Sequence, residues 1–83
     1  MGKEVYVSLD FIQNKEITPD ALRIYMYLGI NEDRGGIYLV EVQDVLGLSR
    51  YKVNKNIELL EEQGFVKREG KKVKMTGGNQ NEK

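Results

Sequence analysis

Arginine, lysine, asparagine and tyrosine side chains are concentrated in one short segment of the chain, which reads RYKVNK. Arg50 and Asn54 are of the types that make two-pronged hydrogen bonds to guanine and to adenine, so we expect both to contact DNA bases. Lys52 and Lys55 are expected to hold backbone phosphates, and Tyr51 to contact a phosphate or a thymine methyl group. The residue types in this segment therefore predict binding to a nucleic acid.

The segment lies on a predicted helix over residues 49–63. Val53, Ile57 and Leu60 recur at the i, i+4, i+7 spacing that places side chains on one helical face, and Ser49 can cap the helix N-terminus. A shorter apolar pattern precedes this helix and ends at a glycine, so we expect a helix, a turn and a second helix. A polar outer face on such a helix is most often simply solvated. The segment that follows decides between solvation and binding.

After Gly64 the period of the pattern changes from that of a helix to that of a strand. Val73 and Met75 alternate with lysines, as on one face of a strand. Gly70 separates two extended runs, which predicts a hairpin over residues 65–75. Cations of this hairpin are expected to reach the phosphates or the minor groove beside the helix. These cations are Lys67, Arg68, Lys71 and Lys72.

The stretch from Leu46 to Val66 resembles, without insertion or gap, the winged helix-turn-helix shared by MarR-type regulators and the DNA-binding domains of plasmid and phage replication initiators. The matching residues are Leu46, Gly47, Leu48, Ser49, Val53, Ile57, Leu60, Gly64, Phe65 and Val66. The resemblance implies an α+β fold with a three-helix core and a small antiparallel sheet, a recognition helix over 49–63 and a basic wing over 65–75. Gln43 and Asn56 depart from the family, which often has alanine there. Either the helices lie slightly further apart, or these amides reach solvent.

A short strand and a turn are expected at the N-terminus. Val5, Val7 and Leu9 alternate with polar residues, as in a strand with one buried face. Ser8 can then cap a single helical turn through Phe11. Together these elements are expected to cover the core.

The first long helix is predicted to start with Thr18 as its N-cap and Pro19 at its first position. The face expected to lie in the core comprises Ile17, Ala21, Ile24, Tyr25 and Leu28. A second apolar face comprises Leu22, Met26 and Tyr27. A helix that is apolar over more than half its circumference is well buried or has a partner, so we expect a homodimer through the second face. The alternative is that the N-terminal strand covers it.

Between the first long helix and the recognition helix, the chain predicts a polar loop, a strand and a helix. The stretch 37–40 is short and β-branched, and it is expected to pair with the wing as a third strand. The stretch 41–46 is expected to form the first helix of the motif. The residues expected to face inward from it are Val42, Val45 and Leu46. Leu59 falls outside the core sector of the recognition helix and is expected to pack against the wing or a second protomer.

The length and the missing residue types limit the class of protein. A chain of 83 residues is long enough for one domain. We predict this domain over residues 1–76, and a disordered tail or linker over 77–83. The chain has no cysteine and no histidine, so we expect no metal, no cofactor and no enzymatic activity. No long apolar segment is readable, so we expect no membrane span and a cytoplasmic protein.

The charges are sorted along the chain although the formal net charge is zero. Residues 1–48 carry four Lys or Arg and eight Asp or Glu, whereas residues 49–76 carry eight and four. The positive half contains the predicted recognition helix and wing, as expected of a surface that meets a polyanion.

Three functions agree with these observations. The favoured one is sequence-specific binding of double-stranded DNA by a small transcriptional regulator, acting as a two-fold dimer on inverted half-sites. The second is the DNA-binding domain of a plasmid or phage replication or partition protein. The third is a protein–protein interaction module whose basic hairpin meets an acidic partner, because a fold alone does not fix a function.

Overall fold

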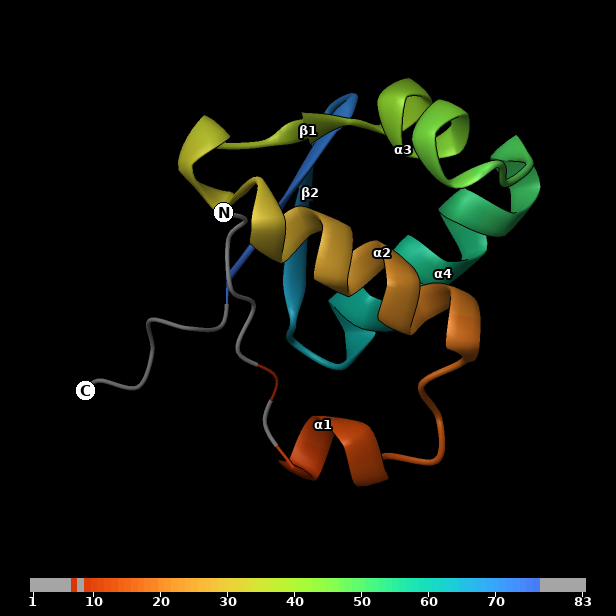
Figure 1. Ribbon diagram of the computed structural model, residues 1–83, viewed down its shortest axis with the longest axis vertical. Coiled ribbons are helices and arrows are strands. Elements are labelled where there is room, and N and C mark those ends of the chain that lie inside the picture. Colours follow the sequence, from red (N-terminus) through yellow and green to blue (C-terminus); the bar gives the residue numbers. More distant parts are fainter. Residues whose placement is uncertain (1–6, 8, 77–83) are drawn as a thin grey trace.

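The structure is a computed structural model and describes residue 7 and residues 9–76. Its elements in chain order are α1 (Leu9–Gln13), α2 (Pro19–Ile30), a 3-10 turn η1 (Glu32–Arg34), β1 (Ile37–Tyr38), α3 (Leu39–Leu46), α4 (Arg50–Glu62), β2 (Val66–Glu69) and β3 (Lys72–Met75). Three main helices pack on a three-stranded antiparallel sheet whose last two strands form a C-terminal hairpin (Figure 1). The predicted α+β class is confirmed.

The N-terminus of α2 is fixed by the residues predicted to cap it. Thr18 Oγ1 accepts a hydrogen bond from the Ala21 amide (2.9 Å), and Pro19 is the first helical residue. The predicted core face is buried, because Ala21, Ile24, Tyr25 and Leu28 all lie in the hydrophobic core. Figure 1 shows that α2 crosses the middle of the molecule, where it contacts α4, α3 and β3.

A tight turn joins α3 to α4. Gly47 ends α3 with a φ of +68°, a left-handed conformation that glycine adopts without strain. Ser49 then caps α4 by accepting from the Lys52 amide (3.1 Å). Val53, Ile57 and Leu60 are buried on the inner face of α4, as the spacing predicts.

The sheet has the strand order β1-β3-β2. Ile37 pairs with Val73 and Tyr38 with Lys72, so the predicted third strand is confirmed. Gly70 has a φ of +63° at the first position of the two-residue hairpin loop, where a II′ turn favours glycine. Val73 is buried and its neighbours on β3 are exposed lysines, which matches the predicted alternation.

Two details of the region 37–46 differ from the prediction. β1 ends at Tyr38 and α3 begins at Leu39. Tyr38 pairs with Lys72, the first residue of β3, so Leu39 lies opposite Lys71 of the hairpin loop and has no strand residue to pair with. The Leu39 amide makes the last bond to this loop, to Lys71 O (2.9 Å). The prediction that Val45 faces inward is wrong, since 54% of it is exposed. On a helical projection at about 100° per residue, Val45 and Leu46 lie on opposite sides of the buried Val42. The helix turns the side of Leu46 toward the core, so Leu46 is half-buried and Val45 is exposed.

The predicted N-terminal strand lies mostly outside the described residues. For its two described residues the strand prediction is wrong: Val7 is not in a strand, and Leu9 is the exposed first residue of α1. The predicted helical turn is present as α1. α1 is attached to the core by Phe11, whose ring stacks on Tyr25 (centroids 4.4 Å apart) and meets the edge of Phe65 (4.6 Å). Ser8 and residues 77–83 also lie outside the described residues.

The two amides that depart from the family pattern behave differently. Asn56 does not reach solvent: it is 8% exposed, accepts from Thr18 Oγ1 and donates to Lys52 O (2.8 Å). Its amide thus joins α2 to α4 with both polar atoms paired. Gln43 is half-buried beside α4. Leu59 packs on the core, beside the start of α2.

Candidate nucleic-acid interface

Side chains from α4 and from the hairpin line a common groove. The groove has a volume of about 450 Å³ and lies between α4, the hairpin loop and the start of α3. Four of the nine predicted contact residues line it: Arg50, Asn54, Arg68 and Lys71. The remaining lining residues are Tyr38, Leu39, Val40, Gln43 and Gly70. Three cations and one amide thus come from segments that are separated in the sequence.

Local geometry explains why these four side chains meet. Arg50 is the first residue of α4, and Asn54 follows it by one turn on the same side. Arg68 shares a face of β2 with the buried Val66, so it leans toward α4 and not away from it. Its Nη2 donates a hydrogen bond to Asn54 Oδ1 (3.1 Å). Lys71 is in the hairpin loop and also lines the groove.

A second group of predicted contacts lies on the other side of α4. Tyr51, Lys52 and Lys55 line a shallow depression of about 460 Å³ that faces the start of α2. Tyr51 is 70% exposed, and Lys55 Nζ lies 5.9 Å from its ring centroid. The structure therefore places these three on the exposed N-terminal half of α4, but outside the groove.

Acidic side chains follow on α4 within one or two turns. Glu58 and Glu62 line the depression together with the lysines. Glu61 turns toward the hairpin, where its Oε2 accepts from the Arg68 amide (3.4 Å). The outer side of α4 is consequently cationic over its first half and anionic over its second half, so only the first half suits a polyanion.

Lys67 and Lys72 are not brought into the groove. Both lie on the outer face of the hairpin, with Glu69 and Lys74, because residues on that face alternate with those facing α4. Lys67 Nζ is 3.8 Å from a Glu69 oxygen, and Lys72 Nζ lies 5.0 Å from the Tyr38 ring centroid. Exposed pairs of this kind are weak, so these lysines remain available on a separate face.

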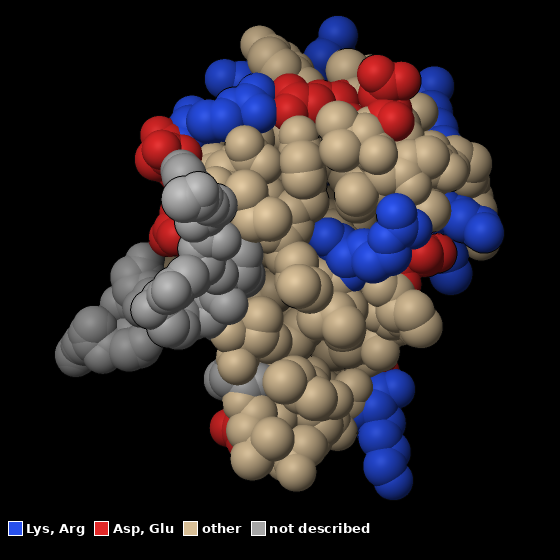
Figure 2. Space-filling view, in the orientation of Figure 1, with Lys and Arg blue, Asp and Glu red and all other residues tan. Residues whose placement is uncertain are grey.

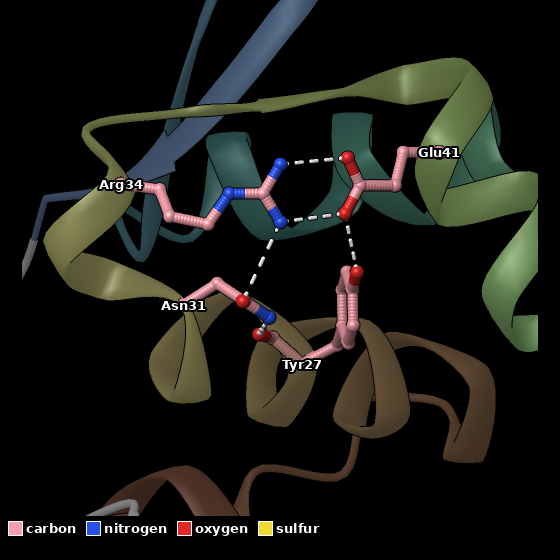
Figure 3. A network of polar contacts seen from close by, with 4 residues as sticks. All are labelled: Tyr27, Asn31, Arg34 and Glu41. Carbon is pink, nitrogen blue, oxygen red and sulfur yellow. Dashed lines mark hydrogen bonds and ion pairs between the residues drawn. The ribbon is translucent and has the colours of Figure 1, made fainter.

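A polar network that the sequence did not indicate fixes α3 against α2 (Figure 3). Arg34 makes two hydrogen bonds to the Glu41 carboxylate, at 2.7 and 2.8 Å. Tyr27 donates its hydroxyl hydrogen to the same carboxylate, and Asn31 Nδ2 donates to Tyr27 O (3.0 Å). The partners come from α2, the loop and α3, so no local spacing in the sequence could have shown it. The network holds the start of α3, which forms one wall of the groove.

The network shifts the pKa values of its members. The two bonds from Arg34, followed by the bond from Tyr27, lower the pKa of Glu41 to about 2. The pKa of Arg34 is raised by the same carboxylate. The pKa of Tyr27 is raised, chiefly because its hydroxyl donates to Glu41. Arg34 and Glu41 therefore neutralise each other near neutral pH.

The face of α2 that was predicted to contact a second copy is only partly free. Leu22 and Tyr27 are half-buried and pack on the core, whereas Met26 is 41% exposed. On α1, Leu9 and Ile12 are also exposed. In the orientation of Figure 1, the face over α1 and α2 is mostly uncharged (Figure 2).

Two further findings concern the residues that the structure describes. Within residue 7 and residues 9–76, no helix has the length and apolar character that crossing a membrane requires. The same residues contain no group of three or more acidic side chains arranged to hold a metal ion. Comparison of the chain with protein-family models, with curated proteins and with solved structures finds no match.

Proposed function

We propose that this chain is a winged helix-turn-helix domain that binds double-stranded DNA in a sequence-specific manner. In this proposal the first half of α4 enters the major groove, and the hairpin is the wing that contacts the flanking backbone. The observation that carries the proposal is the convergence of Arg50 and Asn54 from α4 with Arg68 and Lys71 from the hairpin on one groove. Such a cationic and amide-bearing surface suits both phosphates and base edges.

The placement of the side chains divides their proposed roles. Arg50 and Asn54 contact bases, because both extend from the N-terminal half of α4. Lys71 holds a phosphate from the tip of the wing. Lys52 and Lys55 hold phosphates on the other side of α4, where Tyr51 offers an exposed ring to a phosphate or a thymine methyl group.

A single domain of this size makes few phosphate contacts, so we further propose a two-fold dimer on inverted half-sites. Its contact is the exposed part of α2 around Met26, with Leu22 beside it. We place the domain in a small transcriptional regulator. A replication or partition protein would use the same DNA contacts, but it would bind repeated sites near an origin.

A second candidate function is a protein–protein module. It is favoured by the apolar part of the groove, where Val40 is 69% exposed and Tyr38 is also exposed beside the cations. An acidic peptide with one or two apolar side chains would fit such a surface.

A gel-shift titration with an arbitrary duplex at several salt concentrations tests the proposal. DNA binding predicts a shift that weakens steeply as the salt concentration rises. Selection of bound duplexes from a random pool should then yield one preferred motif, arranged as an inverted repeat. A chain that shifts no duplex at low salt contradicts the proposal and favours the protein–protein module. A shift without any preferred motif contradicts sequence specificity.

A further inference from the structure

One hydrogen bond couples the hairpin to the predicted base-reading side chain of α4. Arg68 on β2 donates from Nη2 to Asn54 Oδ1 on α4, at 3.1 Å across 14 positions of sequence. The backbone of Arg68 is held as well, since its amide lies 3.4 Å from Glu61 Oε2. Arg68 is therefore bound to α4 through both its side chain and its backbone.

The chemistry of the two groups decides which way the Asn54 amide points. A guanidinium only donates hydrogen bonds, so the atom of Asn54 that faces it must be the carbonyl oxygen. The NH₂ group then points away from Arg68. None of the described residues accepts a hydrogen bond from Asn54 Nδ2, and the side chain is only half-buried. The amide is thus oriented with its donor side free.

This orientation is compatible with adenine. A two-pronged contact requires one acceptor and one donor from asparagine. The carbonyl oxygen has two lone pairs, so Oδ1 can accept from Arg68 and from adenine N6 together, while Nδ2 donates to adenine N7. Without Arg68, the amide is free to rotate and to present either atom.

We infer that Arg68 is a positioning residue that fixes the Asn54 amide for base recognition, and is not simply one more phosphate contact of the wing. This inference rests on the proposed DNA binding. It assigns the base preference at one position of the site to a pair of residues, one on α4 and one on the hairpin. It also makes the docking of the hairpin on α4 a condition for specificity.

A pair of matched variants separates positioning from charge. Arg68→Met and Lys74→Met each remove one hairpin cation, but Lys74 lies on the outer face near Glu69 (3.8 Å), away from Asn54. Arg68→Met should lower discrimination at one base pair by about 5- to 150-fold, the range expected for one two-pronged contact. Lys74→Met should leave the preference unchanged. Asn54→Ala should lower that discrimination by a smaller factor in Arg68→Met than in the wild type, because the two residues act through the same contact.

A second measurement on the free protein separates failure of this inference from failure of DNA binding. Relaxation of the Asn54 side-chain NH₂ in NMR should give a lower order parameter in Arg68→Met than in the wild type or in Lys74→Met. Equal order parameters in all three proteins would overturn the inference. Equal loss of affinity for every sequence in Arg68→Met would also overturn it. A wild-type chain that binds no duplex would remove the proposed function, while the NMR result would still judge the positioning.

Discussion

The hydroxyl of Thr18 joins the N-terminus of α2 to α4, because it accepts from the Ala21 amide and donates to Asn56 Oδ1. A hydroxyl has one donor and two acceptor sites, so one side chain can make both bonds. Asn56 is nearly buried and also donates to Lys52 O. The cap of α2 and the hydrogen bond from α2 to Asn56 therefore depend on the same atom.

Replacement of Thr18 by valine should consequently cost more than the loss of a cap. Thr18→Val leaves the buried Asn56 oxygen without its donor, and we expect a loss of about 1–3 kcal/mol in the free energy of unfolding. Ser49→Ala, which removes the cap of α4 alone, should cost about 1 kcal/mol. Urea denaturation measures both values. Thr18→Ser keeps the hydroxyl and should be close to the wild type, so equal stability of the serine and valine variants would contradict this account.

The Arg34–Glu41 pair should make stability depend on acid pH. The pKa of Glu41 is lowered in the folded state to about 2 from an ordinary value of 4.5. Its contribution to stability is then complete above pH 4.5 and is lost as the pH falls toward 2. The difference in free energy of unfolding between the wild type and Glu41→Gln should shrink over this window, as measured by urea denaturation at several pH values.

The partner residue supplies the control for that experiment. Arg34→Gln removes the largest cause of the lowered pKa of Glu41, so most of the pH dependence should disappear in this variant. Tyr27→Phe removes only the hydrogen bond from Tyr27 to Glu41, which is the second cause of the lowered pKa, so this variant should retain most of the pH dependence. A difference between the wild type and Glu41→Gln that stays constant from pH 5 to 2 would contradict the lowered pKa.

The sequence predicted most of the fold because its strongest signals are local. The cap at Thr18, the cap at Ser49 and the apolar spacing of α4 all act within one or two helical turns, and all are confirmed. The error at Val45 has a different origin. In a helix of two turns, a few degrees of rotation decide which side chain faces the core, and packing against α4 sets that rotation.

The arrangement of the candidate site could be predicted only in part. Residue types suggested Arg50 and Asn54 as contacts, and the hairpin pattern suggested Arg68 and Lys71, but nothing local shows that the four line one groove. The sequence also grouped Lys72 with them. Whether a hairpin residue faces α4 or the opposite side depends on strand register, which tertiary pairing determines.

Phe11 should contribute much of the stability despite belonging to a helix of five residues. Its ring is buried against Tyr25 and Phe65, and no other residue of α1 is buried. Phe11→Ala should lower the free energy of unfolding by about 3–5 kcal/mol. Phe11→Leu keeps part of the apolar contact and should cost less. Thermal or urea unfolding followed by circular dichroism measures both, and similar costs for alanine and leucine would argue against tight packing of the ring.

The proposed dimer can be tested at the exposed Met26 without disturbing the core. Met26→Asp adds a charge to the apolar face of α2 and should yield a monomer with wild-type circular dichroism. Met26→Leu keeps the face apolar and should still associate. Sedimentation equilibrium measures the association constant of each protein. A dimer with a micromolar Kd would be largely associated at a protein concentration of about 100 µM. A wild type that is monomeric at that concentration would contradict the proposed interface.

Lys71 should behave as a phosphate contact, since it is in the hairpin loop and lines the same groove as Arg50 and Asn54. Each phosphate contact adds about 0.9 to the slope of log K against log salt concentration. Lys71→Met should therefore lower the slope by about 0.9 per protomer and weaken binding to all sequences alike, as measured by fluorescence anisotropy. Lys74→Met removes the same charge on the outer face and should leave the slope unchanged. Equal slopes for the two variants would mean that the groove does not face the DNA backbone.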